Sequence, residues 1–313
     1  MKYTFIDSSS ANNKIKEVRQ FVKEVKPNIG PLSEDFLILA YLGLYLKHGP
    51  KYEGIVKKAI STTDYLFYNE LSPEELARFI KICNDINYPC CGSFTNVDYA
   101  KNKGKIVTKR EILIGNSDFN KRSQIIGKTI HEMSHCCFYG DKQDDSDPSI
   151  IYSNLRINKI DETGKFISSK REEYDELINS LITYDALLCL ASMSKLSIED
   201  QRINDYIVTI KECEDKNLLE FLAGHHDRTE LVKDLYNNKT YQELLSKEIM
   251  EGNYGIIEKT INDESYNEFL EEIENSFAED FNNTSKIQKN SKKVLHILEG
   301  EPYGLQRIRK YFL

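Results

Sequence analysis

One short pattern constrains this chain more than any other stretch. Residues 131–135 read H-E-x-x-H, with His131 and His135 four positions apart. Side chains at that spacing lie one above the other on the same face of a helix. Two imidazole nitrogens placed in this way can reach one Zn²⁺ at about 2.0–2.1 Å. The pattern therefore predicts a helix that supplies two ligands of a metal site.

The acid inside the pattern has a separate predicted role. Glu132 follows His131 directly, so a helix turns its side chain about 100° away from the ligand face. It can stay outside the coordination shell and still reach a water molecule on the metal. Zinc lowers the pKa of such a water to about 7, and a nearby carboxylate can take its proton. Glu132 is the predicted general base.

The flanking residues also favour a helix. Ile126, Ile130, Met133 and Cys137 recur at spacings of four, three and four, which gives an apolar row beside the histidine row. The polar run 120–123 and Gly140 predict the two helix ends. Residues 111–115 read as a short strand, and a sheet edge next to such a helix can hold a peptide.

These features resemble the zincin metallopeptidases, whose helix carries two zinc histidines and a catalytic glutamate. The resemblance covers about residues 105–190. It implies His131 and His135 as zinc ligands, Glu132 as general base and Zn²⁺ as cofactor. It also implies an α+β fold that is mostly helical, with a small sheet in the catalytic core and a protein or peptide as substrate.

A catalytic zinc has three protein ligands and one open position, so a third ligand is expected. Glu176 resembles the zinc-binding glutamate in the N-E-x-x-S-D helix of gluzincins, although Asp175 precedes it here. Asp144, four residues after Gly140, resembles the aspartate of the aspzincin (deuterolysin-like) G-T-x-x-D loop, but the Tyr-Gly that follows in that family is missing. We predict Glu176, with Asp144 as the alternative. A long helix is predicted from about Ser169 to Ser194, and its other acids also stay open as ligands: Glu172, Glu173 and Asp185.

The second histidine cluster is Gly224-His225-His226-Asp227. His225 or His226 can stabilise the oxyanion of a tetrahedral intermediate, with Asp227 fixing the tautomer. A polar junction after Gly224 explains the same residues without any catalytic role. Tyrosines near the predicted cleft are further candidates for this role: Tyr139, Tyr174 and Tyr184.

The chain organisation follows from composition and pattern. The 313 residues are 40% hydrophobic and 29% charged, enough for a substantial core. We predict a helical region over residues 1–85, a zincin-like core over 86–196 and a second helical region over 197–313. Two or three short strands are expected within 86–118, with a break near Lys109-Arg110.

Charge and cysteine usage exclude several classes of protein. A net charge of −8 argues against nucleic acid as a partner, and no apolar run is long enough to span a bilayer. The seven cysteines are odd in number, which favours reduced thiols. Without a signal peptide, the predicted location is the cytoplasm of the producing cell, with export as an uncleaved effector as the alternative.

Two functions fit these observations. The first is a zinc-dependent endopeptidase that hydrolyses a peptide bond in a specific protein, as a bacterial effector does. The second is a non-enzymatic helical binding protein whose metal is structural or absent. A closed site with a fourth ligand, from Cys136 or Asp144, would favour the second. The sequence predicts no oligomeric state.

Overall fold

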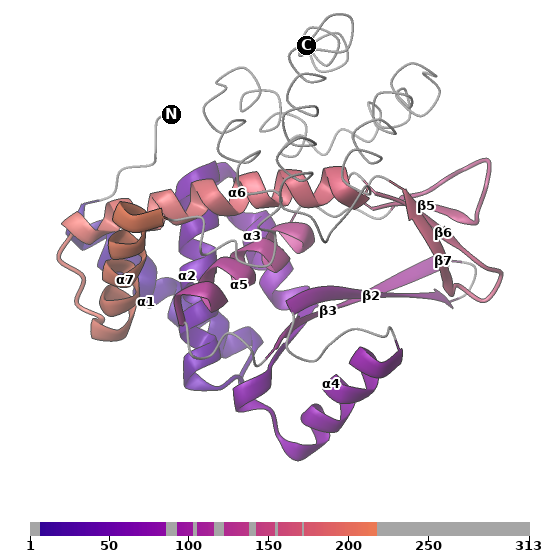
Figure 1. The fold of residues 1–313 in the computed structure, drawn as a ribbon, viewed down its shortest axis with the longest axis horizontal. Coiled ribbons are helices and arrows are strands. Elements are labelled where there is room, and N and C mark those ends of the chain that lie inside the picture. Colours follow the sequence, from indigo (N-terminus) through magenta and orange to yellow (C-terminus); the bar gives the residue numbers. More distant parts are fainter. Residues whose placement is uncertain are drawn as a thin grey trace, which may run out of the picture. The chain divides into compact units, whose positions relative to one another are not determined.

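The computed structural model describes residues 7–85, 93–102, 105–115, 122–137, 142–153, 156–170 and 172–217. Contacts divide the chain into two compact units. The first contains residues 1–97, 109–137 and 182–224, and the second contains residues 98–108, 138–181 and 225–313. The described elements are mostly helices, with two small sheets (Figure 1), which confirms the predicted mostly helical α+β class.

Several helices of the first unit pack around one buried helix. That helix is α2 (Pro31–His48), which is buried from Ser33 to Leu46 and contacts α1, α3 and α5. Its bounds follow from Pro31 at the first helical position and from Gly49, whose φ of 84° ends it. The other helices of this unit are α1 (Ser8–Val25), α3 (Glu53–Thr62), α4 (Pro73–Asp85), α5 (Arg122–Cys137) and α7 (Gln201–Asn217).

A carboxylate from outside the helix caps the N-terminus of α2. Glu70 accepts hydrogen bonds from the backbone N–H groups of Leu32, at 2.9 Å, and Ser33, at 2.8 Å. Gly30 makes room for this contact, because a Cβ atom there would lie 2.4 Å from Cδ of Glu70. The short 3₁₀ helices of the unit are η1 (Pro50–Tyr52), η2 (Tyr68–Glu70) and η4 (Met193–Lys195).

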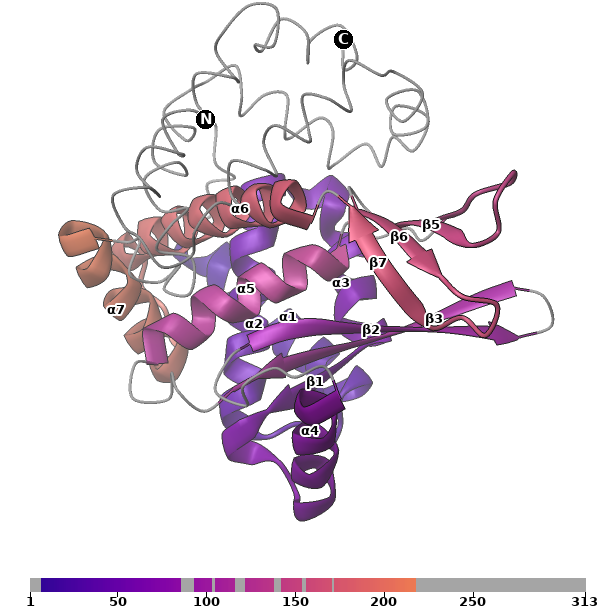
Figure 2. The ribbon, with the colours of Figure 1, turned by 45° about the vertical axis from the view of Figure 1, so that its right-hand side comes forward.

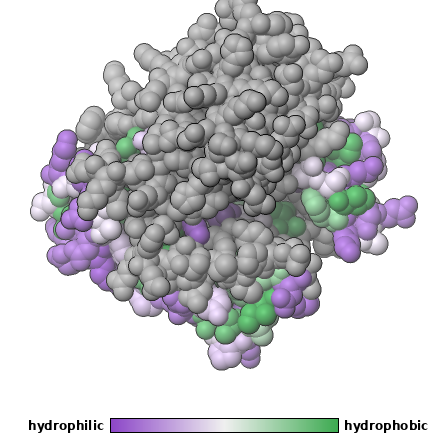
Figure 3. Space-filling view, in the orientation of Figure 1, coloured by the Kyte–Doolittle hydropathy of each residue, from purple (hydrophilic) through white to green (hydrophobic). Residues whose placement is uncertain are grey.

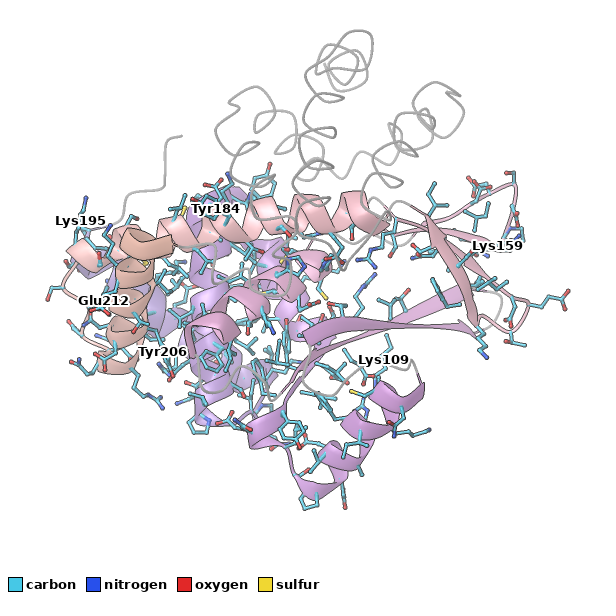
Figure 4. All side chains as sticks on the ribbon, viewed as in Figure 1. Lys109, Lys159, Tyr184, Lys195, Tyr206 and Glu212 are labelled. Atoms are coloured by element: carbon cyan, nitrogen blue, oxygen red, sulfur yellow. The ribbon has the colours of Figure 1, made fainter. Side chains whose placement is uncertain are left out.

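Buried charges connect three helices of the first unit. Arg19 on α1 lies 2.8 Å from Asp35 on α2 and 2.7 Å from Asp200, which precedes α7. Burial raises the pKa of Asp35, although the guanidinium of Arg19 opposes that shift. Tyr206 on α7, labelled in Figure 4, packs against Phe36 with 5.5 Å between the ring centroids. These contacts fix α7 against α1 and α2.

Glu53, at the start of α3, lies between two lysines. Its carboxylate is 2.7 Å from Lys57 and 3.3 Å from Lys14. Burial alone would raise the pKa of Glu53, but hydrogen bonds from these ammonium groups outweigh it and lower the pKa to about 2. Glu53 therefore stays ionised far into the acidic range.

The first sheet has the order β1-β3-β2, formed by β1 (Thr63–Phe67), β3 (Lys105–Ile114) and β2 (Ser93–Asn102). β1 runs parallel to β3, with Thr63 opposite Arg110 and Phe67 opposite Ile114. Two expectations were wrong here. β1 lies inside a region predicted to be helical, and β3 continues through Lys109-Arg110, where a break was expected. Pairing with β1 stabilises β3 in this stretch, and Lys109 places its ammonium 3.0 Å from Glu111.

α4 packs on this sheet through a small apolar cluster. Leu66 and Leu113 from the sheet are buried with Phe79 and Cys83 of α4. A capping box starts α4, since the Ser72 N–H donates to the carboxylate of Glu75 at 2.8 Å. Figure 3 shows apolar residues at the surface over α4.

The second unit contains an antiparallel sheet of the order β4-β5-β6-β7, and Figure 2 labels β5, β6 and β7. Its strands are β4 (Lys142–Gln143), β5 (Ile150–Ser153), β6 (Arg156–Ile160) and β7 (Phe166–Lys170). The turn between β6 and β7 is organised by Asp161, whose Oδ1 accepts from the Thr163 N–H at 2.8 Å. Gly164 follows with a φ of 92°. The sequence 161–164, Asp-Glu-Thr-Gly between two strand-like segments, predicts a hairpin turn here, and the pairing of β6 with β7 confirms it.

The last long helix belongs to both units. α6 (Glu172–Ser192) begins in the second unit and continues from Ile182 onward in the first. Its start and end agree with the long helix predicted from the sequence. Beyond α7 no residue is described, so most of the predicted C-terminal helical region lies outside the described residues.

Candidate metal centre

The H-E-x-x-H pattern lies on α5, as predicted. α5 contacts α2, α3 and α7, and Figure 2 shows it lying over α2. The apolar row packs inward, because the side chains of Ile126, Ile130 and Met133 are completely buried and Cys137 is 6% exposed. Helix propensity alone does not hold such a short helix, so this packing is what fixes the direction of the histidine row.

The two histidines lie side by side. The Nε2 atoms of His131 and His135 are 3.2 Å apart, and the ring planes meet at 82°. Two nitrogen ligands of a tetrahedral zinc, at about 2.0–2.1 Å from the metal, lie about 3.3 Å apart. The observed separation matches that distance. It also permits one ring to donate an N–H to the other, with the direction set by the tautomers.

The histidine pair is buried. Exposed fractions are 6% for His131 and 2% for His135, and Glu132 between them is 7% exposed. Water and substrate therefore have little access to these atoms in this conformation. Cys137, on the same helix, is a protonated thiol, because burial raises its pKa well above the ordinary value.

Glu132 has a hydrogen-bond partner that the sequence did not reveal. The hydroxyl of Thr95, on β2, donates to Oε2 of Glu132 over 2.7 Å. The same hydroxyl lies 3.4 Å from the main-chain oxygen of Glu132. Thr95 falls in a stretch where only short strands were expected, and no pattern there indicated which residue would contact α5.

The predicted third ligand belongs to a small ionic cluster. On α6, Glu176 accepts a hydrogen bond from the Arg156 guanidinium at 2.5 Å. The same guanidinium donates to the buried carboxylate of Asp175 at 2.6 Å. His131, His135 and Glu176 form a group that could hold a metal ion, with one potential ligand atom from each residue and all of these atoms within 4.8 Å of one another.

The alternative third ligands, Asp144 and Asp185, form contacts with residues other than the two histidines. Asp144 organises a turn, since its Oδ1 accepts from the backbone N–H groups of Ser146, at 2.7 Å, and Asp147, at 2.8 Å. Asp185 on α6 forms an ion pair with Lys47 of α2, and both side chains are nearly buried. Neither Asp144 nor Asp185 belongs to the group of possible ligands found among the described residues.

The remaining candidates are only partly described. Glu172 and Glu173 form the first turn of α6, but their side chains lie outside the described residues, as do His225 and His226. Cys136 is 8% exposed, is not disulfide-bonded and does not belong to the possible ligand group. Tyr184, labelled in Figure 4, lies half-buried on α6.

Comparisons with known proteins add no relative. No protein-family model, curated protein or solved structure matches the chain. Among the described helices, none is long and apolar enough to cross a membrane.

Proposed function

We propose that the protein is a zinc-dependent endopeptidase that cleaves a specific protein substrate. The observation that carries the proposal is the pair of imidazole Nε2 atoms 3.2 Å apart on α5, with a buried glutamate between the two histidines in the sequence. Glu176 adds a carboxylate to this pair. Two histidines and one glutamate are a donor set of catalytic zinc sites.

Each residue of the site has its own proposed role in the reaction. His131 and His135 would hold the metal through Nε2, and Glu176 through a carboxylate oxygen. Bound there, Zn²⁺ would polarise the scissile carbonyl and lower the pKa of an attacking water. Glu132 would accept the proton of that water and then deliver it to the departing amine, which is the ordinary general acid–base cycle.

Burial of the site supports a narrow choice of substrate. With Glu132 only 7% exposed, an arbitrary unfolded peptide does not reach the carboxylate without local opening. A substrate that binds elsewhere on the protein and opens the site would be cleaved selectively. We therefore propose one or a few protein substrates, in keeping with a processing protease or an effector.

A binding protein with a structural metal is the second candidate function. The observation that favours it is the same burial, because structural zinc sites are closed whereas catalytic sites keep one position open to water. In that case the metal would stabilise α5 against its neighbours, and Glu132 would have no chemical role.

Two measurements on the purified full chain separate these functions. The first is zinc content in the parent, Glu132→Gln and His135→Ala proteins. We expect about one zinc per chain in the parent and in Glu132→Gln, and loss of zinc in His135→Ala. Zinc retained in His135→Ala would overturn the proposed site.

The second measurement compares newly formed protein N-termini in cells that produce the parent or the Glu132→Gln protein. We expect cleavage of one or a few proteins by the parent, and a rate lower by about 10²–10⁴-fold in the variant, since general acid–base catalysis contributes that much. Zinc in both proteins with no difference in cleavage would refute the peptidase proposal and support a binding protein with a structural metal.

A further inference from the structure

The side chain of Thr95 forms a hydrogen bond with Glu132, the proposed general base. Its hydroxyl lies 2.7 Å from Oε2 of Glu132, the distance of a short hydrogen bond to an ionised acceptor. A hydroxyl has one proton, so the contact to the carboxylate takes it in preference to the main-chain oxygen of Glu132 at 3.4 Å. Both residues belong to the first compact unit.

Two properties make Thr95 suited to hold a carboxylate still. A threonine side chain branches at Cβ, so its χ1 angle is restricted and the hydroxyl has a fixed direction. Its backbone belongs to β2, a strand of a paired sheet, and not to a loop. A glutamate, in contrast, has three rotatable side-chain bonds, and little except a directed partner restricts its carboxylate.

We propose that Thr95 is a positioning residue for Glu132. Its hydroxyl holds Oε2, and this leaves Oε1 as the oxygen that accepts the proton of the attacking water. The inference rests on the proposed peptidase function. It adds a strand residue, outside the H-E-x-x-H pattern, to the groups that determine the rate.

A general base must lie within about 2.6–3.2 Å of the proton donor in the reactive complex, so a rotated carboxylate loses rate without losing substrate. Thr95→Val replaces the hydroxyl by a methyl group of the same size. We expect kcat to fall about 10–100-fold while KM changes less than about twofold. Thr95→Ser, which keeps the hydroxyl, should recover kcat to within about threefold of the parent.

Thr129→Val is the matched control. Thr129 lies on α5 near the histidines, but its hydroxyl donates to the main-chain oxygen of Ile125 at 2.7 Å. The assay uses a peptide that spans the cleavage site mapped by the comparison of new N-termini, and zinc content is measured for every variant. Parent-like kcat in Thr95→Val, or a Thr95→Ser protein no better than Thr95→Val, would overturn the inference.

A second readout does not depend on activity. Unfolding of the metal-free protein in urea is measured for Thr95→Val, Glu132→Ala and the double variant. A hydrogen bond to a charged group contributes enough that Thr95→Val should raise the unfolding equilibrium constant about tenfold in the parent and much less in Glu132→Ala. Equal effects in both backgrounds would show that Thr95 and Glu132 are not coupled by a hydrogen bond, and this would overturn the inference.

The two readouts keep this inference apart from the proposed function. Coupling between Thr95 and Glu132 in a protein without zinc or cleavage activity would refute the peptidase proposal, and the catalytic role of Thr95 with it, while the hydrogen bond would stand. Full activity without coupling would refute the role of Thr95 and leave the peptidase proposal intact.

Discussion

Removing the charge of Glu176 or of Asp185, two acids of α6, should have different consequences for zinc binding and for stability. Glu176 and Asp185 both lie on α6, and both were candidates for the third ligand. Glu176 belongs to the possible ligand group, whereas Asp185 pairs with Lys47. We predict that Glu176→Gln loses zinc and keeps the fold, and that Asp185→Asn loses stability and keeps zinc.

The size of the Asp185 effect follows from burial. The side chains of Lys47 and Asp185 are only 11% and 4% exposed. Removing one partner of a buried ion pair costs about 3–5 kcal/mol, because the other charge stays buried without compensation. At about 2–4 °C per kcal/mol for a folded chain of this size, the Tm should fall by roughly 6–20 °C.

Glu176→Gln should lower zinc affinity more than Asp185→Asn does, and should lower stability less. Changing a residue that only orients a metal ligand costs about 10–100-fold in affinity, so loss of the ligand itself should cost more than about 100-fold. The side chain is 17% exposed, and its Arg156 partner keeps the carboxylate of Asp175. We therefore expect a Tm within a few degrees of the parent.

Competition with a zinc chelator and thermal unfolding of the metal-free proteins measure the two effects. Asp144→Asn is the control, because Asp144 organises an exposed turn. It should bind zinc like the parent. The reasoning is refuted if Asp185→Asn or Asp144→Asn loses zinc while Glu176→Gln retains parent affinity.

Three further outcomes are expected. Arg156→Lys keeps the charge but loses the planar fork that orients Glu176, and zinc affinity should fall about tenfold by chelator competition. Gly30→Ala places a Cβ atom 2.4 Å from Cδ of Glu70, which displaces the cap of α2 and should lower stability in urea by about 1 kcal/mol. The pKa of Glu53 is lowered from 4.5 to about 2, so the stability it contributes is complete above about pH 4.5 and is lost as the pH falls toward 2. Because solvent screens this partly exposed ion pair, Glu53→Gln should remove about 1 kcal/mol of that acid-dependent loss between pH 5 and 2 in unfolding curves.

Local patterns predicted the elements that depend on nearby residues. The α5 helix and the hairpin turn at Asp161 each follow from spacing or turn residues within a few positions. The four-residue spacing of His131 and His135 predicted for the same reason that their side chains are neighbours on one face of α5. Local structure of this kind needs no knowledge of distant partners.

Long-range pairing explains what the sequence did not predict. β1 follows directly after α3 and is stabilised by its parallel partner β3, which comes far later in the chain. The same pairing carries β3 through Lys109, where two adjacent basic residues suggested a break. A strand alternates its faces, so a one-residue change in register would turn Thr95 away from Glu132. No local signal fixes that register.

The central claim is that His131, His135 and Glu176 together hold one zinc ion. An anomalous difference map, collected at the zinc absorption edge from crystals of the zinc-loaded full chain, tests it most directly. The account predicts one strong peak about 2.0–2.2 Å from Nε2 of both histidines and from a carboxylate oxygen of Glu176. A zinc-loaded protein with no peak there, or with its peak at other residues, would contradict it.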